Sequence, residues 1–180
     1  MPGALWIVLF LVVAVVLAVV IYICLQGEHD VRFLPQNKST LTCEYIDKDR
    51  AIFSLSIPYK NFGKQEGIMT DAFVRVLLPK EQFDLAKIIG HFENSEARRD
   101  DDYMEAFIVR ISEKGNFILT LEIIPNNSFS IDEILQNMVD FTIDIYYEVT
   151  GRTYPMIRKA SLTLLLEEFQ QAAAKGADKN

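Results

Sequence analysis

Residues 141–150 read FTIDIYYEVT, and this stretch decides the fold class. Large apolar side chains alternate along it with Thr142, Asp144, Tyr146 and Glu148. A period of two is the pattern of a β-strand that has one buried and one solvated face. The stretch therefore predicts an antiparallel strand that covers one side of a hydrophobic core.

The same alternation recurs along much of the chain. We expect about seven strands, near residues 39–47, 50–58, 68–78, 103–112, 117–124, 141–150 and 157–168. Asn61-Phe62-Gly63 and the residues from Gly151 to Pro155 carry turn chemistry between these runs. Residues 113–116 (EKGN) predict a hairpin between the strands on either side of them.

Two short helices are expected among the strands. Residues 81–92 place Phe83, Ile88, Ile89 and Phe92 near one helical face, after Pro79. Residues 130–133 (SIDE) match a capping box, and the helix that follows is expected to end near residue 140. The C-terminal tail, residues 170–180, is expected to be helical at first and then frayed.

Seven short strands with hairpin connections indicate two sheets packed face to face. In strand count and length, residues 39–169 resemble an immunoglobulin-like antiparallel β-sandwich. The Cys-Trp-Cys core of that family is absent, since Cys43 has no partner and Trp6 lies in the N-terminal segment. The resemblance implies an architecture and carries no function. A small β-barrel with two covering helices is the alternative.

An uncharged segment precedes the domain. Residues 4–25 (ALWIVLFLVVAVVLAVVIYICL) would span roughly 33 Å as a helix, enough to cross a bilayer core. The absence of a charged start and of an A-x-A site argues against a cleaved signal peptide. The expected organisation is a tail (1–3), a transmembrane helix (4–25), a juxtamembrane linker (26–38), the β-sandwich (39–169) and a C-terminal tail (170–180).

All charged residues follow the apolar segment, and the net charge is −7. This acidity argues against nucleic acid as a partner and against a domain pressed onto anionic lipid. Arg32 and Lys38 lie just after the helix, which favours the cytoplasmic side for the domain, with the extracytoplasmic side as the alternative.

The sequence contains no catalytic or cofactor motif. Neither His29, outside the apolar segment, nor His91, late in the expected first helix, belongs to a metal-spaced pair, so both are interpreted as surface or cap-region residues. Cys43 is interpreted as a buried, inert thiol. No cofactor, no metal and no enzymatic activity are therefore expected.

Two groups of residues form a speculative interaction surface. One is a charged loop, for which a solvated loop or a protein contact is favoured over a calcium site. The other is the polar face of the strand at 141–150, for which a solvated face is weighed against docking of a basic partner. The loop group is Arg98, Arg99, Asp100, Asp101 and Asp102, and the strand group is Asp144, Tyr146 and Glu148.

These observations predict a single-pass membrane protein whose non-catalytic β-sandwich serves protein–protein interaction or assembly. A membrane-tethered sensor of a small ligand or second messenger is the alternative. A hydrolase that uses a carboxylate pair drawn from Asp71, Asp100, Asp101, Asp102 and Glu105 is the third possibility, and its carboxylates would need a defined separation.

Overall fold

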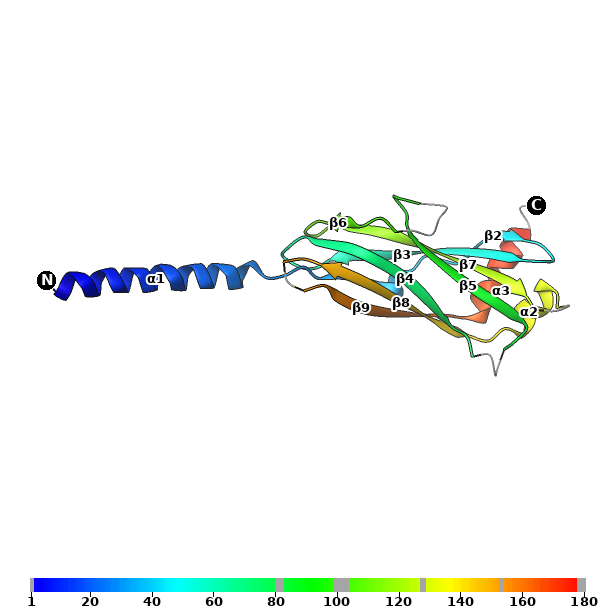
Figure 1. Ribbon diagram of the computed structural model, residues 1–180. Coiled ribbons are helices and arrows are strands. Elements are labelled where there is room, and N and C mark those ends of the chain that lie inside the picture. The colour runs from blue at the N-terminus through cyan, green and yellow to red at the C-terminus, as the bar shows by residue number, and fades with distance from the viewer. Residues whose placement is uncertain (1, 80–82, 99–103, 127–128, 153, 178–180) are drawn as a thin grey trace.

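The computed structural model describes residues 2–79, 83–98, 104–126, 129–152 and 154–177. Figure 1 shows a long helix, α1 (Pro2–Gln26), that projects from one end of an elongated domain built of two sheets. The predicted mainly β fold class, with one N-terminal apolar helix, is confirmed.

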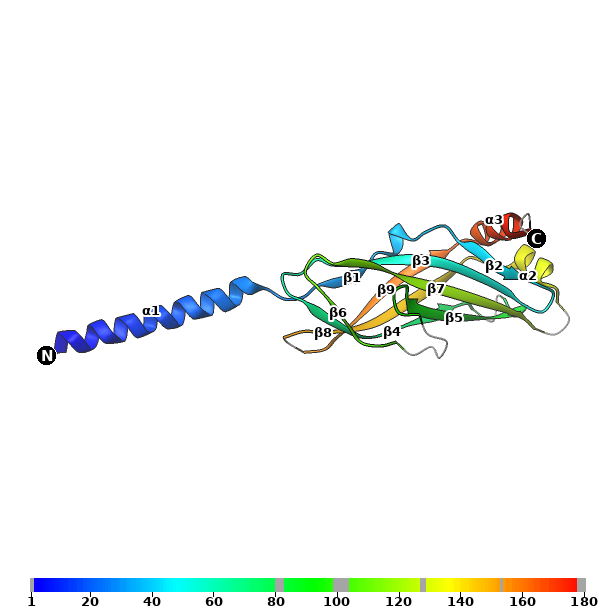
Figure 2. The same cartoon turned by 90° about the horizontal axis from the view of Figure 1, so that it is seen from above.

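The strands form two antiparallel sheets. The five-stranded sheet has the order β1-β3-β7-β5, with β2 also paired to β3, and the four-stranded sheet has the order β6-β4-β8-β9. The bounds are β1 (Val31–Phe33), β2 (Thr42–Ile46), β3 (Ala51–Asn61), β4 (Gly67–Leu77), β5 (Ala86–Asn94), β6 (Phe107–Val109), β7 (Lys114–Pro125), β8 (Phe141–Thr150) and β9 (Met156–Leu164). The sheets face each other in Figures 1 and 2, so the described strands make a sandwich rather than a closed barrel.

The core lies between the two sheets and follows from the alternation read in the sequence. Every second residue of β3 is buried, and β7 and β8 alternate in nearly the same way. Phe33 of β1 packs edge-on against Phe117 of β7 and Tyr147 of β8, with ring centroids 5.1 and 4.9 Å apart. These rings join the two sheets across the end of the domain that lies nearer α1.

The predicted capping box is confirmed. The Ser130 hydroxyl accepts the Glu133 N–H and the Glu133 carboxylate accepts the Ser130 N–H, at the start of α2 (Ile131–Asn137). The helix buries Ile131, Ile134 and Leu135 at the end of the domain far from α1.

The helix expected at residues 81–92 is wrong. Residues 86–94 form β5, which pairs with β7 from Ala86 opposite Pro125 to Asn94 opposite Phe117. Gly90 lets β4 come close, since a Cβ there would lie 2.9 Å from a Val74 methyl. The β-branched pair Ile88-Ile89 and Phe92 suit a strand that gains a full ladder, and this pairing outweighs a weak helical pattern.

The predicted hairpin at residues 113–116 is also wrong. β6 pairs with β4, whereas β7 pairs with β3 and β5, so the chain crosses from one sheet to the other at this point. The corner is a tight turn in which the Glu113 N–H donates to the Arg110 carbonyl at 3.1 Å and Ser112 has a φ of 62°. The left-handed backbone conformation of Ser112 turns the chain from one sheet into the other. A simple two-stranded hairpin does not need this change of direction.

The last strand is shorter than the sequence indicates. β9 ends at Leu164, and α3 (Leu166–Ala177) follows at once. Asp140 accepts the Leu166 N–H at 2.8 Å and so satisfies one of the free donors at the helix start. Phe169 and Ala172 turn into the core from this helix, and Phe169 packs between Phe53 and Phe141.

The segment between α1 and the sandwich contains structure of its own. β1 pairs with the end of β3, and a short 3-10 turn, η1 (Pro35–Asn37), leads on to β2. Only residues 27–30 therefore separate α1 from the first strand.

Candidate functional site

The solvent side of the four-stranded sheet carries the strand group predicted from the sequence. In the registers of β4, β8 and β9, Asp71 lies opposite Glu148, Phe73 opposite Tyr146, and Tyr146 opposite Lys159. Asp144 lies one row further along, beside Ser161. We call this surface, made of Asp71, Phe73, Asp144, Tyr146, Glu148 and Lys159, the acidic–aromatic face.

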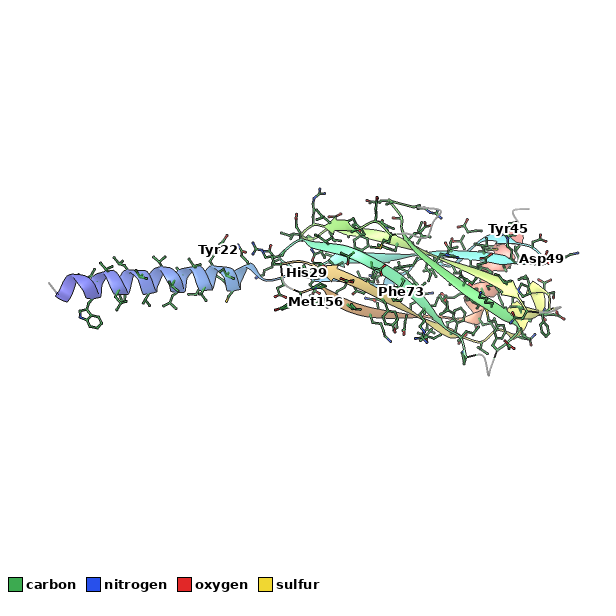
Figure 3. The ribbon with its side chains drawn as sticks, viewed as in Figure 1. Tyr22, His29, Tyr45, Asp49, Phe73 and Met156 are labelled. Carbon is green, nitrogen blue, oxygen red and sulfur yellow. The ribbon has the colours of Figure 1, made fainter. Side chains whose placement is uncertain are left out.

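An exposed aromatic pair stands at the centre of this face. The Phe73 and Tyr146 rings are stacked, with centroids 5.4 Å apart and an interplanar angle of 16°. Phe73 is 53% exposed, and Figure 3 shows it on the broad side of the domain. Lys159 lies over the Tyr146 ring at 6.0 Å. A large aromatic surface left in water on a flat sheet is typical of a protein contact.

Asp144 belongs to this face, but its carboxylate already has hydrogen-bond partners within the domain. Its carboxylate accepts a hydrogen bond from Ser161 at 2.6 Å and from Lys159 at 2.9 Å, with a longer one from Tyr146 at 3.4 Å. The Ser161 hydroxyl and then the Lys159 ammonium hold the pKa of Asp144 below its ordinary value. Asp144 thus orients Lys159 and Tyr146 rather than offering a free charge.

Asp71 and Glu148 differ from Asp144 in having no cation. They face each other directly across β4 and β8, and among the described residues neither forms an ion pair. Lys159 of this face pairs with Asp144, and the nearby Arg75 of β4 also lies opposite Asp144 rather than Glu148. Like charges directly opposite each other destabilise a sheet. A basic side chain from another molecule would relieve this repulsion.

Arg98, the one described member of the charged-loop group, lies on the other side of the sandwich. Arg98 pairs with Glu93 at 2.7 Å and borders a hollow on the outer face of the five-stranded sheet, so it is not brought together with Asp144, Tyr146 and Glu148. The remaining members of that group, Arg99, Asp100, Asp101 and Asp102, lie outside the described residues.

The hollow beside Arg98 is polar. It has a volume of about 410 Å³ and is lined mostly by hydroxyl side chains, Glu44 and Arg98, with Ile52, Leu55 and Ile118 as the apolar part of the lining. The Glu44 carboxylate accepts a hydrogen bond from Ser54 at 2.5 Å across the β2–β3 pair. The hydroxyl residues are Ser39, Thr42, Ser54, Ser56 and Thr120.

Of the carboxylates considered for hydrolysis, only Asp71 and Glu105 belong to the described residues, so the carboxylate pair stays a prediction. Asp71 stands on the outer face of β4, Glu105 precedes β6, and the other three lie outside the described residues. Within the described part of the chain, no group of three or more His, Cys, Asp or Glu residues could hold a metal ion. Cys43 is half-buried against Gly176, and burial raises the pKa of its thiol.

The junction of α1 and the sandwich is a built site that sequence reasoning missed. His29, expected at the surface, is only 3% exposed, so that expectation is wrong. Its ring fills a space bordered by Gly67 and Gly151, where a Cβ on either glycine would crowd it. His91, expected late in a helix, lies instead in β5. In the sequence, Gly67 and Gly151 indicated only turns. The structure shows that these positions must also lack a side chain, because the His29 ring packs against them.

Asn61 is the centre of this junction. Its side-chain oxygen accepts the N–H groups of Asp30 and Gly63 at 3.1 and 2.9 Å. Its amide donates to the carbonyl oxygens of Gln65, Val109 and Arg110 at 2.8, 3.2 and 3.2 Å. One fully buried side chain therefore ties the juxtamembrane segment to the β3–β4 turn and to the end of β6.

An ion-pair cluster fastens the same segment from the side. Asp30 pairs with Arg32 at 2.6 Å and with Arg158 of β9 at 2.5 Å. The hydrogen bond from Arg32, assisted by Arg158, lowers the pKa of Asp30 against the opposing effect of burial. Gln26, the last residue of α1, also contacts the side chains of Gln65 and Arg152. The helix end is thus held against two turns of the sandwich.

No protein-family model and no curated protein matches this chain. Among solved structures, it is similar to a candidate lipoprotein, YcdA, of Bacillus subtilis, with 9% identity and a TM-score of 0.39 over 81% of this chain and 40% of that one. It is also similar to the GAE domain of GGA2p from Saccharomyces cerevisiae, with 8% identity and a TM-score of 0.31 over 70% of this chain and 97% of that one. The GGA1 GAE domain of yeast gives 9% identity and a TM-score of 0.35 over 68% and 97%.

The chain thus spans 40% of the length of the Bacillus lipoprotein structure. Similarities at these identities and TM-scores do not indicate a function for this chain.

Proposed function

We propose that this protein is a single-pass membrane protein whose non-catalytic β-sandwich binds a basic segment of a protein partner through the acidic–aromatic face. The observation that carries this proposal is the placement of Asp71 and Glu148, which form no ion pair with any described residue, beside the exposed Phe73–Tyr146 stack. Carboxylates attract Lys and Arg, and aromatic faces add cation–π attraction for the same side chains.

The membrane anchor in this proposal is α1. Residues Trp6–Gln26 have a mean hydropathy of 3.4, and none of that stretch is buried against the domain. The packing of Gln26 and His29 into the sandwich supports a helix that stays attached to the domain. We therefore propose residues 4–25 as the transmembrane segment, 26–38 as the juxtamembrane segment and 39–169 as the interaction domain, between tails at 1–3 and 170–180.

We also propose that the domain lies on the cytoplasmic side. The first cations after the helix are Arg32 and Lys38, and cytoplasmic flanks carry the excess of Lys and Arg. A single-cysteine protein with Cys24→Ser, Cys43→Ser and Asp49→Cys tests this placement. Its exposed thiol at position 49 would react with a membrane-impermeant maleimide only after lysis, whereas labelling of intact cells would contradict the proposal.

A displayed random peptide library, selected on the full chain in lipid nanodiscs, tests the binding face. We expect the selected peptides to be rich in Lys and Arg and to lose binding to a Phe73→Ala variant and to an Asp71→Asn, Glu148→Gln variant. A matched control, Thr120→Ala on the outer face of the other sheet, should bind them unchanged. Peptides without basic enrichment, or binding that survives both face variants, would overturn the proposal.

The polar hollow beside Arg98 favours a second candidate, a membrane-tethered sensor of a small polar ligand. A lining of hydroxyl groups with one carboxylate and one guanidinium suits a ligand rich in hydrogen-bonding groups. Such a ligand would raise the melting temperature of the full chain by mass action, and Ser54→Ala would reduce that rise. A panel of sugars and nucleotides that leaves the melting temperature unchanged would contradict this candidate.

A further inference from the structure

The end of the sandwich nearest α1 exposes an apolar side chain on each of its three connecting turns. Phe62 of the β3–β4 turn is 50% exposed, Ile111 of the β6–β7 corner 53%, and Tyr154 of the β8–β9 turn 85%. All three turns lie around the point where α1 leaves the domain, as the two ribbon views show (Figures 1 and 2). Large apolar side chains at the tips of three separate turns are not explained by packing within the domain.

A hollow lies between two of these turns. It has a volume of about 440 Å³, and Ile68, Ile108 and Ile111 line it together with Gln65, Glu66 and Arg152. Each of the three isoleucines is exposed. Three further exposed apolar side chains therefore lie at this end, beside polar and charged ones.

A row of like charges crosses the five-stranded sheet at the same end. Arg32 of β1 lies opposite Lys60 of β3, and Lys60 lies opposite Lys114 of β7, all on the outer face. Arg32 pairs with Asp30, whereas Lys60 and Lys114 form no ion pair among the described residues. Lys60 instead lies 4.9 Å from the centre of the Phe62 ring. Adjacent cations on one sheet face cost stability unless an anion covers them.

The charge of this end is opposite to that of the whole chain. Residues 26–32, 59–67, 109–115 and 150–158 contain seven basic and four acidic residues, although the whole chain has a net charge of −7. The overall acidity, which argued against contact with anionic lipid, therefore does not describe the surface around the helix exit.

The junction keeps this end next to the helix. Residues 27–30 are the only connection, and the bonds of Asn61 and the buried His29 ring hold them in the sandwich. If α1 spans a bilayer, the three turns and the basic row lie at the level of the lipid headgroups. Aromatic residues such as Tyr154 favour this interface, and cations there bind anionic headgroups.

We propose that the α1-proximal end of the sandwich is a second membrane contact, in which Phe62, Ile111 and Tyr154 enter the headgroup region and the Arg32–Lys60–Lys114 row binds anionic phospholipid. This inference rests on the proposed membrane span of α1 and is independent of the acidic–aromatic face. The contact fixes the orientation of the domain relative to the bilayer, because a single transmembrane helix can tilt in the membrane and would carry the attached domain with it.

The full chain in nanodiscs tests this proposal. In the Cys24→Ser, Cys43→Ser background, Tyr154→Cys carries a nitrobenzoxadiazole label, and Asp49→Cys carries the same label as a control. Figure 3 places Asp49 at the end of the domain far from α1. The discs contain phosphatidylcholine alone or mixed with phosphatidylglycerol, and quenching by dithionite reports exposure to water.

We expect the label at position 154 to be quenched severalfold more slowly than the label at 49 in the anionic discs. Replacement of Lys60 and Lys114 by Gln should remove most of this protection, because each cation contributes to binding of anionic headgroups. The matched control Lys87→Gln, on β5 at the far end, should leave the protection intact. A higher salt concentration should likewise weaken the protection of the label at position 154.

Equal quenching at the two positions would overturn the proposal. Protection that is the same in phosphatidylcholine alone, or that survives Lys60→Gln and Lys114→Gln, would overturn the role of anionic lipid. Protection that appears only in discs holding two copies of the chain would instead indicate a contact between the copies. Binding of the selected basic peptides, measured on the same discs, shows separately whether the acidic–aromatic face works. Failure of α1 to enter the discs would overturn both proposals.

Discussion

The side chain of Asn61 holds the backbone of Asp30, whose N–H donates to Asn61 Oδ1 at 3.1 Å. The same carboxamide also bonds to four other backbone groups of the β3–β4 turn and β6–β7 corner. Asp30 comes four residues after the end of α1, so this hydrogen bond connects the segment that follows the helix to the interior of the sandwich. The position of the domain relative to the helix thus depends on a buried side chain.

Replacement of Asn61 by Ala should destabilise the domain strongly. Its loss removes bonds to five backbone groups, of which the Arg110 carbonyl keeps its bond from the Glu113 N–H. Each buried group left unsatisfied costs about 1–3 kcal/mol, less where water enters. We expect the free energy of unfolding to fall by about 3 kcal/mol or more, measured by denaturant titration of the full chain in detergent. The matched control Asn116→Ala, on the exposed side of β7, should change it little. Equal effects of the two variants would contradict the role assigned to Asn61.

Replacement of Gly151 by Ala should force His29 out of its site. The new methyl group would overlap His29 Nδ1, and overpacking of this kind costs about 1–3 kcal/mol. A His29→Ala replacement removes the obstacle, so the double variant should be more stable than the sum of the two single losses predicts. A double-mutant cycle measures this coupling. Simple additivity would show that the glycine and the histidine do not pack together.

Replacement of Phe169 by Ala tests whether α3 is part of the core. The ring is fully buried and lies 5.1 Å from Phe53 and 5.7 Å from Phe141 between centroids. Large-to-small changes of a buried Phe cost about 3–5 kcal/mol. Thermal unfolding should therefore show a large loss, whereas Gln170→Ala on the exposed side of the helix should cost much less. A small loss for Phe169→Ala would indicate that α3 is a dispensable tail.

The Asp144 cluster should make stability depend on acidic pH. Hydrogen bonds from Ser161 and Lys159 lower the pKa of Asp144 in the folded state. A lowered folded-state pKa gives stability that is present above the unfolded-state pKa, near 3.8, and is lost as pH falls through the folded-state value. Melting temperatures should thus fall below about pH 4, and Asp144→Asn should make that fall smaller. Ser161→Ala should also make that fall smaller. If neither variant changes the fall of the melting temperature at acidic pH, the role given to Asp144 is contradicted.

Most strands were predictable from the sequence because their side chains alternate between core and solvent. Residues 141–150 and 51–61 show the pattern without interruption, and the structure buries every second side chain there. The segment 86–94 was not predictable in this way, because β5 lies at a sheet edge and most of its side chains are half-buried. Its long pairing with β7 is a tertiary effect that no local pattern records.

The candidate site was predictable only in part. Period-two spacing placed Asp144, Tyr146 and Glu148 on one face, but their partners Phe73, Asp71 and Lys159 come from other strands and depend on register. The junction was hidden for the same reason, since Asn61 and His29 contact residues of three turns, β3–β4, β6–β7 and β8–β9, that are far apart in the sequence. A lone buried polar residue surrounded by turn glycines leaves no periodic signal.

Photo-crosslinking in the native membrane tests the central proposal most directly. A benzoylphenylalanine replaces Phe73 or Tyr146 on the acidic–aromatic face, or Ser54 or Thr120 on the outer face of the other sheet, in the full-length protein. Our account predicts protein crosslinks from the first pair, none from the second pair, and their loss when Asp71→Lys and Glu148→Lys are added. Crosslinks of equal yield from both sheets, or crosslinks that persist after charge reversal, would contradict it.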